Sequence, residues 1–131
     1  MTECPHCQTS IEEHKASRCL DAWVAEAVMG WRTHRITDRV WVGKSTDNLI
    51  QKSAWEPSTS IMNAWEVVDI LTSMDWMVFT GTNLKDGSYC RLEWHDPFDP
   101  KWNQFMSRDS SIPLAICRVA LEAINDPLPQ V

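Results

Sequence analysis

The stretch WEPSTSIMNAWEVVDILTSMDW, residues 55–76, contains the clearest helix signal in the sequence and leads directly into a strand. Three consecutive hydroxyl residues at positions 58–60 are candidate N-caps for a helix predicted over residues 61–73. An apolar stripe recurs at helical spacing through Ile61, Ala64, Trp65, Val68 and Leu71. Because further apolar residues widen this stripe, we expect helix 61–73 to be the most buried helix of the fold.

Two elements are predicted before this helix. Residues 17–29 predict an amphipathic helix, with Ser17 as its N-cap and Gly30 as the left-handed residue that ends it. The β-branched and aromatic segment 39–43 predicts a short strand. The polar segment 44–57 reads as a long loop, and its length makes it a place to look for function.

Four segments follow the central helix. Residues 76–80 and 88–95 predict two strands of an antiparallel hairpin, the second of which alternates apolar and polar side chains. Residues 96–109 contain two Asp-Pro pairs and read as a second long loop. Residues 111–124 predict the last helix, with a serine cap and Pro113 in its first turn.

The predicted order α-β-α-β-β-α indicates an α/β (α+β) fold. Three amphipathic helices each need an apolar surface to cover, so we expect a small layered α/β/α sandwich around one three-stranded antiparallel sheet. The chain of 131 residues suits one domain. We predict an N-terminal arm at residues 1–16, a single domain at 17–126 and a C-terminal tail at 127–131.

The formal net charge of −6 argues against broad binding to nucleic acid, because neutralising phosphates requires clustered cations. The basic residues concentrate at only one place, around Arg32, His34, Arg35 and Arg39, which we interpret as a solvated loop. No apolar run is long enough to span a membrane, and the N-terminus lacks the apolar region of a secretory signal. We therefore expect a protein of the cytoplasm.

The N-terminal arm carries thiols and imidazoles at close spacing. The pattern C-x2-C-x6-H-x4-C is formed by Cys4, Cys7, His14 and Cys19. A CxxC turn directs two sulfur atoms at one centre, and a histidine with a further cysteine would complete a tetrahedral zinc site. His6, inside the CxxC turn, is a less favourable ligand. The alternative is unliganded thiols in a mobile arm. We expect no other cofactor.

Four segments resemble the small phage proteins grouped as the phage ABA sandwich domain family, namely LDAWVAEAVMGW, PSTSIMNAWEVVDIL, WMVF and IPLAICRVALEAI. The resemblance covers residues 17–124 and implies an α/β/α layered domain from a bacteriophage or prophage. It places the protein in the cytoplasm of a bacterial host. It implies no reaction and no catalytic residue, and the CxxC arm lies outside the matching segments.

No phosphate-binding loop, dinucleotide fingerprint, HExxH motif or nucleophile elbow occurs in the sequence, so we expect a protein that is not an enzyme. The first hypothesis is a counter-defence protein that binds and sequesters a small host molecule, such as a nucleotide immune signal. Indoles can stack on a base while cations hold phosphate. The candidate ligand-binding residues are Trp55, Arg91, Lys101, Trp102 and Arg108.

Two alternatives remain open at this point. The acidic charge also suits a protein–protein inhibitor that covers a host effector. A structural or dimerising phage module is the other alternative, and a homo-oligomer is compatible with either.

Overall fold

The computed structural model describes residues 3–43, 48–83, 85, 87–95 and 102–125. Within these residues the helices are α1 (Arg18–Ala27), α2 (Ile61–Ser73) and α3 (Ile112–Asn125). The strands are β1 (Arg32–Thr33), β2 (Val40–Val42), β3 (Leu49–Gln51), β4 (Met77–Asn83), β5 (Gly87–His95) and β6 (Trp102–Asp109). Short 3-10 helices at Ile11–Glu13 and Lys52–Ala54 complete the described elements. The fold is α+β, as predicted.

The helix boundaries follow from local capping. The Ser17 side chain accepts a hydrogen bond from the Leu20 amide at 3.2 Å, and Ser60 accepts one from the Asn63 amide at 3.4 Å. Each bond satisfies an amide that has no partner inside the first helical turn. Gly30 follows α1 with φ at +72°, the left-handed conformation that suits a helix end. The predicted caps are therefore confirmed.

The prediction of a single three-stranded sheet is wrong. The described strands form two antiparallel sheets, ordered β1-β2-β3 and β4-β5-β6. The strand predicted at 39–43 is β2, and it pairs with two short neighbours instead of with the 76–95 hairpin. Segment 44–57, predicted as loop, contributes β3 and a 3-10 helix. The described part of the second predicted loop is β6, which pairs with β5 from Ser88 opposite Asp109 to His95 opposite Trp102.

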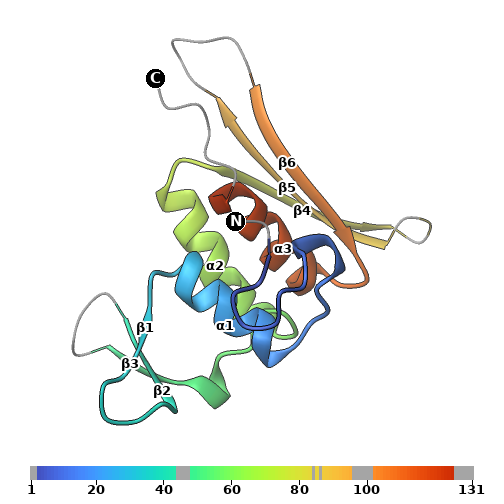
Figure 1. Cartoon of the computed structure of the whole chain (residues 1–131). Helices are drawn as coiled ribbons and strands as arrows, with labels where there is room; N and C mark the ends of the chain where they lie inside the picture. Colours follow the sequence, from blue (N-terminus) through green and yellow to red (C-terminus); the bar gives the residue numbers. More distant parts are fainter. Residues whose placement is uncertain (1–2, 44–47, 84, 86, 96–101, 126–131) are drawn as a thin grey trace.

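All three helices lie on one face of the β4-β5-β6 sheet, and the small β1-β2-β3 sheet lies at the opposite side of the helical layer (Figure 1). No helix among the described residues covers the outer face of the larger sheet. The expected α/β/α layering is therefore replaced by helices between two unequal sheets. Along β5 the side chains of Cys90 and Leu92 face the helices and are fully buried, while Arg91 on the outer face is half-buried.

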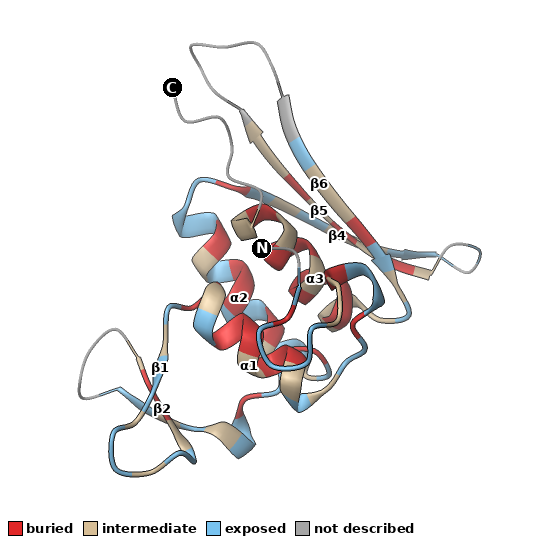
Figure 2. Ribbon diagram, in the orientation of Figure 1, coloured by how far each residue is buried: buried red, intermediate tan, exposed pale blue. Residues whose placement is uncertain are grey.

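The core is centred on α3 rather than on α2. Eight side chains of α3 are buried, against four of α2. Figure 2 shows this contrast as nearly continuous burial along α3 and a mixed surface on α2. Met62 is 78% exposed and Trp65 is 45% exposed, so the broad apolar surface of helix 61–73 lies partly in solvent. The expectation that this helix is the most buried is wrong, because only one of its faces has a partner.

No helix in the described part of the chain is long and apolar enough to cross a membrane.

Candidate metal centre

The CxxC turn is closed by backbone hydrogen bonds. The Cys4 amide donates to the Thr9 carbonyl at 2.9 Å, and the Gln8 amide donates to the Cys4 carbonyl at 2.8 Å. Gln8 has φ at 60°, which allows the chain to reverse within a few residues. The His6 amide lies 3.4 Å from the Cys4 sulfur and donates toward it. This turn places the Cys4 and Cys7 sulfur atoms on one side.

His14 is buried and its ring is fixed in one orientation. Its Nδ1 lies 2.9 Å from the Lys15 carbonyl oxygen, an acceptor, so Nδ1 carries the proton. The unprotonated Nε2 then lies 3.4 Å from the Cys7 sulfur. A carbonyl bond that fixes the tautomer is the usual arrangement for a histidine that binds metal. His14 therefore presents its lone pair to the thiols.

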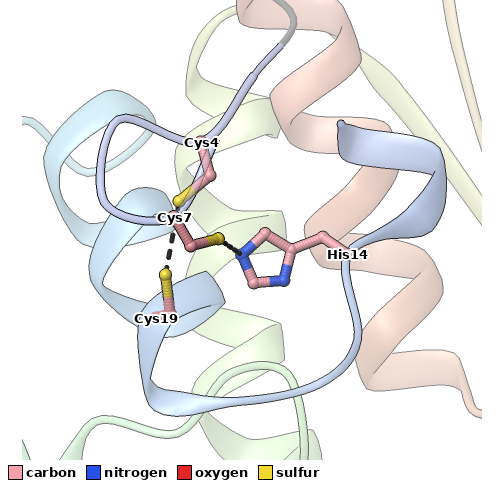
Figure 3. Close-up of side chains that lie close together, drawn as sticks. All are labelled: Cys4, Cys7, His14 and Cys19. Atoms are coloured by element: carbon pink, nitrogen blue, oxygen red, sulfur yellow. Dashed lines mark hydrogen bonds between the residues drawn. The ribbon is translucent and has the colours of Figure 1, made fainter. Parts of the chain in front are cut away.

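The fourth side chain comes from α1. Cys19 lies in the first helical turn, two residues after the capping Ser17, and its sulfur is 3.4 Å from that of Cys4. Helix capping therefore determines where this thiol sits, while the arm brings the other three ligands to it. Figure 3 shows the four side chains converging from the CxxC turn, the segment after the 3-10 helix and α1.

The ligand atoms of Cys4, Cys7, His14 and Cys19 all lie within 4.8 Å of one another. A zinc ion bound to sulfur at about 2.3 Å in tetrahedral geometry separates its ligands by roughly 3.8 Å. The observed sulfur–sulfur and sulfur–nitrogen distances of 3.4 Å require only small adjustments to reach that geometry. Three soft sulfurs and one imidazole form a zinc-type set, and hard cations such as Mg²⁺ prefer oxygen. The residues fit zinc.

Two of the thiols, Cys7 and Cys19, have pKa values shifted in opposite directions. The pKa of Cys7 is lowered to about 6, chiefly because the Thr9 side chain and then its backbone hydrogen-bond to the sulfur. The pKa of Cys19 is raised to about 12, first by burial and then by hydrogen bonds with Cys4 and Cys7. Neighbouring thiolates repel one another, so one of them keeps its proton. A divalent cation removes this conflict because it stabilises every thiolate that it binds.

The backbone of His14 is anchored to α3, the last helix of the chain. Arg118 in α3 donates from Nε to the His14 carbonyl at 3.0 Å, and its Nη2 donates to the same oxygen. The guanidinium also forms an ion pair with Asp109, whose other oxygen accepts from Ser107 at 2.6 Å. This network ties the metal ligand to α3 and β6. No signal in the sequence indicated it, because Arg118 lies 104 residues from His14.

The four predicted metal ligands are thus brought together. His6, predicted to be the less favourable ligand, instead pairs its Nε2 with Glu26. No other cluster of three or more potential ligands occurs among the described residues.

The predicted ligand-binding residues do not form one group. Trp55 is 2% exposed, donates its indole N–H to the Asp21 carbonyl at 3.0 Å and packs against Trp31. It belongs to the core, so it offers no stacking wall. Arg91 and Arg108 lie on the outer face of the larger sheet, one on β5 and one on β6. Trp102 begins β6, but its side chain is not described, and Lys101 falls outside the described residues.

Comparison with known proteins gives one match. Residues 22–121 match the family described as Phage ABA sandwich domain. No curated protein and no solved structure matches the chain. The matched segment begins after the last of the four metal ligands, so the family does not define the arm.

Proposed function

The chain belongs to the Phage ABA sandwich domain family, and from this premise we propose that it is a zinc-stabilised, non-enzymatic phage accessory protein. It acts in the cytoplasm of the bacterial host as a counter-defence protein. Its function is to bind and sequester a small host molecule, such as a nucleotide immune signal. The observation that carries the zinc assignment is the convergence of four ligand atoms within 4.8 Å.

The ligand set supports a structural role for the metal. Catalytic zinc keeps one position open for water or substrate, whereas structural zinc is held by four protein ligands. Three cysteines and one histidine supply the four ligand atoms that would fill a tetrahedral shell. The metal would then fix the arm onto α1, while Arg118 connects the same arm to α3. An arm held rigid in this way is consistent with a protein that binds a ligand. A zinc ion with four protein ligands has no open position for the water molecule that hydrolysis requires.

The capture of a small anionic molecule is supported by a hollow lined with cations beside the small sheet. This hollow measures about 680 Å³ and includes Arg18, Arg39 and Lys52 in its wall. Its volume falls within the range of small-molecule sites, about 300–1,000 Å³. It lies partly in segment 44–57, which the sequence marks as a place to look for function.

A second candidate, the inhibition of a host protein, has its own supporting observation. The outer face of the β4-β5-β6 sheet exposes Met77 at 42% and Phe79 at 38%, and Arg91 lies over the Phe79 ring at 4.7 Å. Aromatic and arginine side chains of this kind are enriched at the centres of protein interfaces. Recovery of a host protein in a stoichiometric complex with this chain would favour inhibition over sequestration.

The zinc assignment is tested by metal analysis of protein purified without chelator. We expect close to one equivalent of zinc in the wild type. Cys7→Ser and Cys19→Ser should each reduce the zinc content below about 0.2 equivalents, because three ligands bind far more weakly than four. Cys90→Ala is the matched control, since it removes a thiol outside the cluster and should retain the metal. Less than about half an equivalent in the wild type would end the assignment.

Sequestration is tested by thermal unfolding in extracts of bacterial small molecules. A ligand that binds only the folded state raises the melting temperature, and the stabilisation grows with the logarithm of its concentration relative to Kd. We expect a shift that increases with the amount of extract. Extracts from several hosts that leave the melting temperature unchanged would refute sequestration.

A further inference from the structure

We propose that Arg18, Arg39 and Lys52 form a binding site for a small ligand that carries two or more phosphate groups, in the hollow between the start of α1 and the small sheet. This inference rests on the proposed sequestering function and specifies both the location of the site and the class of ligand.

Three segments that are distant in the sequence form the hollow. They are the first residue of α1, the turn before β2 and the end of β3 with the 3-10 helix after it. The hollow is open to solvent on one side, and its volume of about 680 Å³ is sufficient for a nucleotide-sized molecule. A second hollow of about 360 Å³ lies along the same strand β2 and includes Arg32, His34 and Arg35 in its wall.

The local charge is opposite to that of the whole molecule. The wall of the larger hollow contains three cations and one carboxylate, Asp38, whereas the chain carries a net charge of −6. Arg18 and Arg39 are exposed, and within the described residues neither guanidinium forms an ion pair. Arginine that forms no ion pair can present its planar fork to phosphate, which it binds through two parallel hydrogen bonds.

Lys52 is held in position before any ligand arrives. Its Nζ donates to the Thr33 hydroxyl at 2.8 Å and lies 4.2 Å from the centroid of the Trp41 ring. Its backbone amide donates to the Arg39 carbonyl at 2.9 Å, which fixes the two cationic residues side by side. The ammonium group retains two further N–H donors. Since the side chain is already ordered, binding loses less conformational entropy than it would with a mobile lysine.

The metal centre also positions this site. Arg18 lies between the capping Ser17 and the metal ligand Cys19, so zinc binding would fix the backbone next to the guanidinium. Two hollows along one strand, both lined by cations, favour a compact ligand with more than one phosphate group. A long nucleic acid strand is disfavoured, because the negative charge of the rest of the surface would repel it.

Calorimetric titration of the zinc-loaded protein tests the site, with inorganic pyrophosphate, ADP and a single-stranded oligonucleotide as probes. We expect pyrophosphate and ADP to bind, and Arg39→Gln and Arg18→Gln each to weaken binding about tenfold, the usual effect of losing a charged hydrogen bond. Lys85→Gln is the matched control, because it removes one positive charge from the β4–β5 turn. It should change the affinity less than about twofold.

The proposal is overturned if the wild type binds neither pyrophosphate nor ADP at millimolar concentration, or if Lys85→Gln weakens binding as much as Arg39→Gln. It is also overturned if the oligonucleotide binds more than about 100-fold tighter than ADP, because binding would then reflect many phosphate contacts along a strand. Circular dichroism and zinc content confirm that each variant is folded. Within the part of the chain that the structure describes, the Arg39 side chain forms no hydrogen bond or ion pair, so Arg39→Gln tests the site even if Arg18→Gln is unstable.

Phosphatase treatment of the bacterial extract separates this proposal from the broader one. If phosphatase treatment abolishes the thermal shift and Arg39→Gln reduces it, both proposals are supported. A shift that is unaffected by either of these changes overturns the phosphate site and leaves sequestration in place. The absence of any shift with untreated extract refutes sequestration itself.

Discussion

The five cysteines divide between two regions of the molecule with opposite chemistry. Cys4, Cys7 and Cys19 lie in the arm and the first turn of α1, where their sulfur atoms and a His14 ring nitrogen lie within 4.8 Å of one another. Cys90 in β5 and Cys117 in α3 lie in the main core, and both are 0% exposed. The first group can hold a metal, whereas the second serves as small apolar packing.

Burial alone does not distinguish the two regions. Cys4 is 1% exposed, which is close to the values of the core cysteines. The difference lies in the neighbours, because Cys4 contacts a backbone amide and a second thiol, while the pKa of Cys90 is raised by burial and no other cause. A thiol becomes useful for chemistry when other groups stabilise its thiolate.

Alkylation rates should show the largest contrast between the regions. In metal-free protein at pH 7, Cys7 with its pKa of about 6 is mostly thiolate, whereas Cys90 with a pKa of about 12 is almost entirely protonated. The thiolate populations differ by a factor on the order of 10⁵. We expect iodoacetamide to modify Cys7 first, and Cys90 and Cys117 only upon global unfolding. Peptide mapping by mass spectrometry over time provides the measurement.

Zinc-loaded protein is the control for this experiment, because a coordinated thiolate is protected and Cys7 should then react slowly. If iodoacetamide modified Cys90 as fast as Cys7 in the native metal-free protein, the arm and the core would not differ in thiol reactivity, and the prediction would be wrong.

Arg118→Met should remove the hydrogen bonds that connect the cysteine-containing arm, at the His14 carbonyl, to α3 in the main core. The Arg118 and Asp109 side chains are 15% and 3% exposed, so removing the cation leaves a buried carboxylate without its counter-charge. We expect a loss of about 3–5 kcal/mol in the free energy of unfolding. The variant also removes the donors to the His14 carbonyl, so zinc affinity should fall about 10–100-fold. Urea denaturation and competition with a chromogenic chelator measure these two effects.

The double variant Arg118→Met/Asp109→Leu separates stability from positioning. Because it removes both charges, it should recover most of the lost stability. It cannot restore the donors to His14, so the zinc affinity should remain low. Equal zinc affinity in the wild type and both variants would mean that Arg118 does not position the metal ligand.

The parts of the fold that the sequence predicts are those determined by neighbours in the chain. Helix 61–73 was predicted with its observed bounds, because Ser60 and the apolar stripe are local signals. The clustering of Cys4, Cys7, His14 and Cys19 was predictable for the same reason. They lie between positions 4 and 19, and a CxxC turn with a capped helix is sufficient to bring them together.

The parts that the sequence does not predict depend on distant partners. Strand β6 exposes Gln104 and Arg108 on one face and directs the less exposed Phe105 and Ser107 to the other, and it becomes a strand because β5 offers an edge for pairing. The apolar, β-branched composition of segment 39–43 is compatible with a strand in either sheet. It joins the small sheet because it pairs with β1 and β3. The position of Trp55 in a predicted loop suggests a ligand-binding residue. In the structure its indole N–H instead donates to the Asp21 carbonyl of α1.

The smallest expected contrast is the response of the two regions to alkaline pH. Burial raises the pKa of Cys90 from 9.0 to about 12, and that of Cys117 in the same direction. Below pH 9 these thiols are protonated in both folded and unfolded states, so their contribution to stability is complete. Between pH 9 and 12 the unfolded state loses the proton while the folded state retains it, and stability falls by about 1.4 kcal/mol per pH unit for each thiol.

Cys7 responds with the opposite sign. Its pKa is lowered from 9.0 to about 6, so in metal-free protein its contribution is present above pH 9 and is lost as the pH falls toward 6. Cys90→Ala should therefore flatten the alkaline loss of stability, and Cys7→Ser should not. Urea denaturation at pH 9 and pH 10 should show the wild type losing about 1 kcal/mol more than Cys90→Ala. The substitution leaves every tyrosine and lysine in place, so their ionisation contributes equally in the wild type and in Cys90→Ala. If both proteins lost the same free energy of unfolding between pH 9 and pH 10, ionisation of the Cys90 thiol would not drive alkaline unfolding.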